Sequence, residues 1–274
     1  MQKAVVGLFV FGALLADAHA ADIPQPRVSS RTNVSAASWD GLYAGLKLGG
    51  DLGRFHWDST PTFAGLVAGG TTIPSNLTTP FSTSLNSTNI IAGGQIGYQW
   101  QVREAVFGLE ADFQRTGANT GRFVPLDPPA SVTSAFDTSG PTTDLLSAKA
   151  PYSASLRTRF GLAVQERVLI YGTAGIAFAN VTATGNYVAR TGLGSAAATY
   201  ERNAILTGWT AGFGAEIALT DKWLLGAEYR YSDYGGRSSQ LGSLTNNPSG
   251  RIWNINNSIG ITSSSTVLKL NYKL

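Results

Sequence analysis

The chain has no cysteine, which excludes a disulfide framework, a lipid-bearing cysteine and a cysteine-ligated zinc site. Charged residues make up only 14% of the sequence, against about 25% in ordinary soluble domains. The net charge of +3 is spread along the chain without a run of Lys or Arg, so we expect no nucleic-acid partner. After the N-terminal segment, no apolar run approaches the roughly 20 residues of a membrane-spanning helix. A surface this poor in charge needs an explanation other than solubility in water.

The N-terminus predicts a secretory signal peptide. Lys3 precedes an apolar run at residues 4–16, and Ala18-His19-Ala20 forms a small-residue cleavage site. The apolar run is shorter than a spanning helix. We therefore expect residues 1–20 to be removed after Ala20.

The rest of the sequence is dominated by alternation of apolar and polar positions. In WDGLYAGLKLGG, residues 39–50, the even positions from 42 to 48 are Leu or Ala, and the odd ones from 41 to 49 are Gly, Tyr or Lys. Such a period of two is typical of a β-strand with one apolar face. The same pattern recurs at residues 89–102, 105–114, 152–164, 168–181, 205–217, 223–232 and 267–274. These eight predicted strands, most of roughly 10 to 14 residues, exceed the common globular length of about 5 to 6.

Short and long connections alternate between these strands. Tight turns are predicted at residues 101–104, 165–167 and 220–222, and long connections at residues 52–88, 115–151, 182–202 and 235–265. A transmembrane β-barrel has short periplasmic turns, long extracellular loops and an even strand count. A bilayer also solvates outward apolar side chains while requiring every backbone group to be paired. A soluble β-sandwich would show the same alternation, but it explains neither the asymmetry of the connections nor the scarcity of charge.

We therefore predict an all-β fold: an eight-stranded antiparallel up-and-down transmembrane β-barrel in residues 39–274, with four long extracellular loops. Residues 21–38 are expected to form a short periplasmic extension. Aromatic side chains near the strand ends are expected to lie at the membrane interfaces. Trp39 and Tyr171 are placed among those at the short-turn side.

Ten charged residues, Lys273 among them, fall on the faces predicted to point inward, and nine of them make up the predicted network. The bore of an eight-stranded barrel is about wide enough to be filled by side chains. Both signs of charge would meet there, either as a proton or ion path or as a plug of paired charges. The mixture of signs and the narrow bore favour the plug. The predicted network consists of Lys47, Glu110, Asp112, Arg157, Arg159, Glu216, Glu228, Arg230 and Lys269.

Motifs for chemistry are nearly absent. After signal cleavage, the chain would have one histidine, His56, two residues before Asp58. A hydrolase needs such a base beside a nucleophile and oriented by a carboxylate, and an exposed loop histidine is more often simply solvated. We expect no catalytic residue, no metal site and no cofactor.

The ordered segments WDGLYAGLKLGG, IGYQWQ, FGLEADFQ, SLRTRFGLAV, GWTAGFGAEIAL and WLLGAEYRYSDYG resemble the alphaproteobacterial outer-membrane β-barrel family. Its members include porin-family and outer-membrane immunogenic proteins, related to the OmpA transmembrane barrel. The resemblance covers residues 39–274. It implies an integral outer-membrane protein, inserted by the barrel assembly machinery through its C-terminal strand.

From these observations we expect a non-enzymatic outer-membrane barrel with a structural and surface-interaction role and a plugged bore. Its expected partners are outer-membrane lipids, lipopolysaccharide and, during insertion, the barrel assembly machinery, and we expect a monomer rather than a trimer. The alternative is a narrow porin, or a receptor that binds a ligand such as haemin on its loops.

Overall fold

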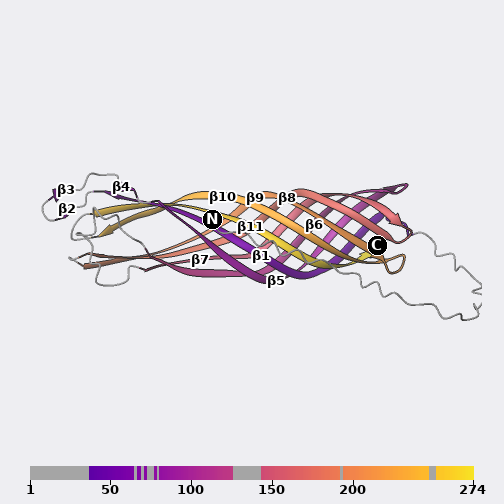
Figure 1. Ribbon diagram of the computed structural model, residues 1–274, viewed down its shortest axis with the longest axis horizontal. Coiled ribbons are helices and arrows are strands. Elements are labelled where there is room, and N and C mark those ends of the chain that lie inside the picture. The colour runs from indigo at the N-terminus through magenta and orange to yellow at the C-terminus, as the bar shows by residue number, and fades with distance from the viewer. Residues whose placement is uncertain are drawn as a thin grey trace, which may run out of the picture. The chain divides into compact units, whose positions relative to one another are not determined.

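The computed structural model describes residues 37–64, 67–68, 71–72, 77–78, 80–125, 143–191, 194–246 and 251–274. Chain contacts separate the segment Met1–Val34 from a compact unit Ser35–Leu274, and the predicted signal peptide lies outside the described residues. Eight long strands build the compact unit (Figure 1). They are β1 (Gly41–Ala64), β5 (Phe81–Val102), β6 (Ala105–Pro125), β7 (Thr143–Gln165), β8 (Val168–Thr191), β9 (Gly194–Ala218), β10 (Trp223–Asn246) and β11 (Arg251–Lys273). No helix in the described part of the chain is long and apolar enough to cross a bilayer.

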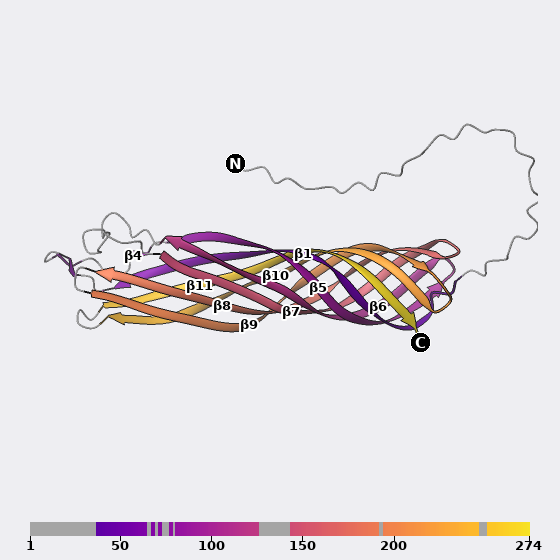
Figure 2. The same cartoon turned by 90° about the horizontal axis from the view of Figure 1, so that it is seen from below.

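The long strands form a closed antiparallel barrel, as the sequence predicts. Each pairs with its neighbour in the chain, and β1 pairs with β11 to complete the ring. A short strand, β4 (Leu77–Thr78), adds to the end of β1, while β2 (Val67–Ala68) and β3 (Thr71–Thr72) pair with each other. The C-terminus lies at the end with the short turns, here called the turn end (Figure 2). The opposite end, where β2 to β4 lie, is called the extension end.

The register of the barrel can be followed around the ring. Starting at Tyr43 on β1 and stepping from each residue to its partner on the next strand, the path returns to β1 at Gly53, ten positions further on. A stagger of this kind tilts the strands against the barrel axis. Because ten is even, inward residues stay inward around the whole ring.

Alternation along the strands sorts side chains between lipid and lumen. On β1 the outward Leu46 and Leu48 are 71% and 60% exposed, whereas the inward Lys47 between them is 4% exposed. Glycine makes room on the crowded inner face: a side chain at Gly49 would meet the backbone oxygen of Thr266 at 2.0 Å. In the part of the barrel nearer the turn end, the outer face is therefore mainly apolar and the inner face is packed.

The strands extend much further than the sequence analysis predicts. Residues 52–64 continue β1 and residues 81–88 begin β5, although both ranges were expected to be loop. The connection between β8 and β9 shrinks from residues 182–202 to residues 192–193. Apolar alternation marks a strand only where its outer face meets lipid. Beyond that level, Ser, Thr and Asn on the outer face can meet water while the backbone stays paired, so the alternation disappears and the strand continues.

Two aromatic residues lie inside the barrel and not at the membrane interface, where they were expected. Trp39 is fully buried and Tyr171 is 3% exposed, both in the lumen near the turn end. Residues 37–40 cross this mouth before Gly41, whose φ of 118° lets the chain turn into β1. Other aromatic residues do lie outward, such as Trp100 at 48% exposed and Phe113 at 57%.

Candidate functional site: the charged barrel interior

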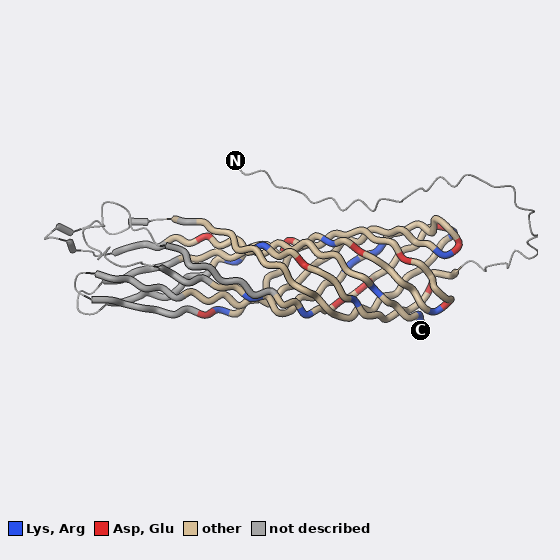
Figure 3. The backbone as a smooth tube through the Cα atoms, turned by 60° about the horizontal axis from the view of Figure 1, so that its bottom comes forward, with Lys and Arg blue, Asp and Glu red and all other residues tan. Residues whose placement is uncertain are grey.

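All nine charged residues of the predicted network point into the lumen. They come from six strands, β1, β6, β7, β9, β10 and β11. Figure 3 shows basic and acidic positions interleaved along the barrel. Their side chains are at most 4% exposed. The structure brings them together in one cluster of five bases and four acids, here called the charge cluster: Lys47, Arg157, Arg159, Arg230 and Lys269 with Glu110, Asp112, Glu216 and Glu228.

Asp112 gathers three bases on the side nearer the extension end. Lys47 binds its carboxylate directly, Arg157 Nη2 lies 3.2 Å from Oδ2, and Arg230 Nη1 lies 3.1 Å from the same oxygen. Ser155 donates a further hydrogen bond. Arg230 also donates to Gln114 Oε1 at 2.6 Å. One carboxylate thus joins three strands across the lumen.

Arg157 is the centre of the cluster. Its Nη2 contacts Glu110 and its Nη1 contacts Glu228, so that one guanidinium bridges β6 and β10. Lys269 Nζ lies between the same two acids, 3.0 Å from Glu110 Oε1 and 2.7 Å from Glu228 Oε2. The planar guanidinium can satisfy several carboxylates at once, which a lysine ammonium does less directionally.

Arg159 and Glu216 form a third group nearer the turn end. Arg159 Nη2 lies 2.6 Å from Glu216 Oε2. Its guanidinium stacks on the Tyr171 ring, 3.6 Å from the centroid, a cation–π contact that strengthens away from water. Asn271 donates to Glu216 Oε1 at 3.1 Å. Each charged group here has both a counter-charge and a polar partner.

Lys47 and Lys269 lie directly opposite each other on β1 and β11. Like charges at such positions repel. The two side chains instead separate, Lys47 toward Asp112 and Lys269 toward Glu110 and Glu228. The barrel therefore tolerates this pair only because acids from β6 and β10 reach into the centre.

Two tyrosines and two amides complete the cluster but were missed by a search for charge alone. Tyr43 donates to Glu110 Oε2 at 2.7 Å, and Tyr171 donates to Glu228 Oε2 at 3.1 Å. Asn271 donates to Glu216, and Gln114 accepts from Arg230. Tyr43 and Lys47 both occupy odd positions of the first strand. The alternation in the sequence therefore does place Tyr43 on the inward face.

Apolar layers close the lumen on both sides of the charge cluster. At the turn end, Trp39 packs with a buried group that includes Val106, Leu169 and Leu224. Ala37 N donates to Glu166 O at 2.8 Å and Trp39 N to Gln101 Oε1 at 2.8 Å, which hold the chain across the mouth. Toward the extension end lies a second apolar layer: Phe55, Leu85, Ala148, Ala150, Ala177, Ala179, Val181, Leu206, Tyr234 and Ile261.

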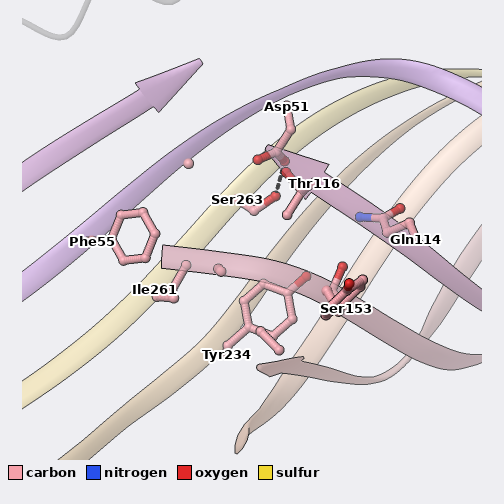
Figure 4. Close-up of a pocket in the computed structure, with 12 residues that line it drawn as sticks. Asp51, Phe55, Gln114, Thr116, Ser153, Tyr234, Ile261 and Ser263 are labelled. Carbon is pink, nitrogen blue, oxygen red and sulfur yellow. Dashed lines mark hydrogen bonds between the residues drawn. The ribbon is translucent and has the colours of Figure 1, made fainter. Parts of the chain in front are cut away.

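A small cavity separates the charge cluster from the second layer (Figure 4). Asp51 and Ser263 line one side and are hydrogen-bonded to each other, while Phe55, Ile261 and Tyr234 line the side toward the apolar layer. Its volume is about 20 Å³, which is room for about one water molecule. It is too small for a substrate.

His56 lies outside the lumen on the exposed face of β1. Its Nδ1 is 3.3 Å from Ser84 Oγ, and the neighbouring Asp58 accepts a hydrogen bond from Ser82 at 2.6 Å. Among the described residues these are separate pairs, and Asp58 accepts no hydrogen bond from His56. The described part of the chain also contains no group of three acidic or histidine residues placed to hold a metal ion.

A closed eight-stranded barrel with an apolar outer face and a buried charged interior defines an integral outer-membrane β-barrel protein. The family model of the outer membrane protein beta-barrel domain matches residues 8–259, and the chain belongs to this family.

The chain is similar to curated outer-membrane proteins. The chain is 28% identical over 242 residues to a 31 kDa outer-membrane immunogenic protein of Brucella melitensis, covering 86% of this chain and 89% of the relative. It is 29% identical over 244 residues to a 25 kDa outer-membrane immunogenic protein of Brucella abortus, covering 87% and 88%. The solved outer membrane protein OprG of Pseudomonas aeruginosa aligns with 82% of this chain and 96% of its own, at a TM-score of 0.42 and 10% identity.

Proposed function

We propose that this outer-membrane protein is a closed barrel, whose role is structural and whose extension end is a surface for interaction outside the cell. The observation that carries the proposal is the layered filling of the lumen. An apolar layer, the charge cluster and a second apolar layer follow one another along the bore. The proposal includes export by a signal peptide cleaved after Ala20, insertion by the barrel assembly machinery and lipopolysaccharide as a neighbour.

The charge cluster acts as a plug because its charges are paired. A row of charges that conducts ions must bind them weakly enough to release them. Here, Arg157 already contacts Glu110, Glu228 and Asp112, and Lys269 contacts two of the same acids. An entering ion would have to break these pairs, and isolated buried charges are costly.

Conductance of the purified protein in planar bilayers tests this proposal. We expect no steady single-channel steps from the wild-type protein, under conditions in which a porin control conducts. Trp39→Ala opens a cavity only in the layer at the turn end and leaves the charge cluster and the second layer in place, so this variant should also remain closed. Steady steps from the wild-type protein would contradict the plug and support the narrow porin.

Localisation and folding need an independent measurement. We expect the protein in the outer-membrane fraction and a shift in gel migration between unheated and boiled detergent samples. A chain that remains in the soluble periplasmic fraction would contradict the proposed export and insertion, whatever its conductance.

A further inference from the structure

The outer face of β1 changes from apolar to basic at one level. Its outward apolar side chains run from Leu42 to Leu52, and the next two outward residues are Arg54 and His56, both exposed. Positions 42 to 52 span eleven residues, which matches the about 9–11 residues of a tilted strand that crosses a bilayer. We therefore place Leu52 at the edge of the hydrocarbon and Arg54 and His56 at the level of the lipid head groups.

A groove, here called the lower groove, lies on the apolar part of this outer face. It measures about 610 Å³, within the range of about 300–1,000 Å³ of ligand sites. Lys47 and Lys269 belong to the wall behind it, but their side chains point inward to the charge cluster. Outward apolar residues from four strands line the groove: Leu46, Leu48, Ala92, Leu225, Leu268 and Leu270. Its lining suits an acyl chain.

A second groove, here called the upper groove, lies on the same four strands toward the extension end. It measures about 510 Å³. Arg54 and His56 of β1 line it together with Asn86 and Thr88 of β5 and Thr262 of β11. Hydroxyl and amide groups both donate and accept hydrogen bonds, as sugar hydroxyls require, and a guanidinium binds phosphate through paired charge-assisted hydrogen bonds. The upper groove therefore suits a phosphorylated sugar.

Gly50 lies between the two grooves. It faces outward on β1, two positions from Leu48 in the lower groove and two from Leu52 in the upper groove. A side chain at Gly50 would meet nothing nearer than the backbone oxygen of Asn89 at 4.0 Å. The space outside Gly50 is therefore open, and the two grooves follow one another along β1 without a side chain between them.

The charge of Arg54 is available to a ligand. Its Nε donates to Asn86 Oδ1 at 3.2 Å, and it forms no ion pair with an acid in the described part of the chain. Asp58 and Asp233 are the outward acids described on these four strands. Asp58 accepts a hydrogen bond from Ser82, Asp233 accepts one from a backbone N–H, and neither lines a groove. The upper groove thus keeps a positive charge.

We propose that the two grooves together bind one phosphorylated glycolipid of the outer leaflet, the lipid A part of lipopolysaccharide. Its phosphate lies at Arg54 and His56, its sugar against Asn86 and Thr262, and one acyl chain passes Gly50 into the lower groove. The order of the grooves matches the order of these parts in a lipid that stands upright in the membrane. The inference rests on the proposed function, which places the extension end outside the cell.

Native mass spectrometry of the purified full-length protein tests the site, because it counts the lipids that stay bound when detergent is removed. Titration with diphosphoryl lipid A should saturate at one tightly bound lipid per barrel. Phosphatidylethanolamine has acyl chains but no net charge, and phosphatidylglycerol has a negative charge but no phosphorylated sugar. Both should bind at least about tenfold more weakly than lipid A.

Two variants examine the two parts of the site. The double variant Arg54→Gln with His56→Gln should lower the affinity for lipid A at least about tenfold, the loss expected for one good charge-assisted contact. Gly50→Phe fills the passage between the grooves and should lower the affinity by a similar factor. All three positions point outward, so both variants should still show the heat-dependent gel shift of the folded barrel.

Lys149→Gln is the matched control. Lys149 is exposed on the outer side of β7, between the inward Ala148 and Ala150, and it lines neither groove. Its replacement removes one positive charge from the outer surface and should leave the affinity for lipid A unchanged.

The proposal is overturned if the wild-type protein retains lipid A no more tightly than phosphatidylglycerol, or if either variant binds lipid A as well as the wild type. Both comparisons use protein that shows the gel shift and fractionates with the outer membrane. A failure of the lipid site is thereby distinguished from a failure of the proposed export and insertion.

Discussion

Arg157→Met tests how much the charge cluster stabilises the barrel. Arg157 is 1% exposed and contacts Glu110, Glu228 and Asp112. Methionine keeps much of the side-chain volume but removes the charge, so three acids lose a shared counter-charge. Breaking a buried ion pair by removing one partner costs about 3–5 kcal/mol. We expect the free energy of unfolding to fall by that amount.

Urea unfolding in lipid vesicles, with folded and unfolded bands separated on gels, measures this difference. Arg115→Met is the control, because Arg115 is exposed on the outer side of β6 and such substitutions change stability by about 0.5 kcal/mol or less. The double variant Arg157→Met with Glu228→Gln should cost less than the two single costs added together, by about 0.5–3 kcal/mol. An Arg157→Met protein within 1 kcal/mol of the wild type would refute a stabilising role for the pairs.

Three further substitutions can be measured by the same unfolding assay. Leu46→Arg places a charge on the lipid face, where Leu46 is 71% exposed, and should cost about 2–4 kcal/mol at the middle of the bilayer; no loss would show that this face does not meet lipid. Trp39→Ala leaves a cavity in the fully buried layer at the turn end and should cost about 3–5 kcal/mol, whereas an interfacial Trp39 would cost much less. Gly235→Ala forces a side chain into a φ of 66° and should cost about 1–2 kcal/mol, while Gly50→Ala, which meets only Asn89 O at 4.0 Å, should be close to neutral.

The alternation in the sequence was sufficient to sort residues between lipid and lumen, but not to choose their partners. The pairing of β6 with β7 accounts for the contacts of Glu110 and Asp112 with Arg157. The structure also joins Lys47 on β1 to Asp112 on β6, and Arg157 on β7 to Glu228 on β10. These contacts cross the lumen between strands that do not pair. They depend on the height of each residue along the barrel axis, which the stagger of ten positions sets.

The alternation of apolar and polar residues also did not predict how far the strands extend. Residues 53–59 present Arg54, His56 and Asp58 on the outer face, yet they pair with β11 and β5. The place of Trp39 could not be read from the alternation either. Trp39 lies before the first strand, so its position in the sequence is compatible with the membrane interface or with the lumen. In the structure, Trp39 packs against Val106, Leu169 and Leu224 and therefore lies in the lumen.

The sequence by itself determined the strand number, the two faces and nine of the buried charges, although not Asp51, because a period of two is a local property of each strand. Only the tertiary structure decided which charges meet, where the lumen closes and how far the strands continue beyond the apolar outer band. Those features arise from closure of the ring, from its stagger and from bulges such as the one at Gly235. They place residues from distant strands at one height, and no local pattern in the chain records that height.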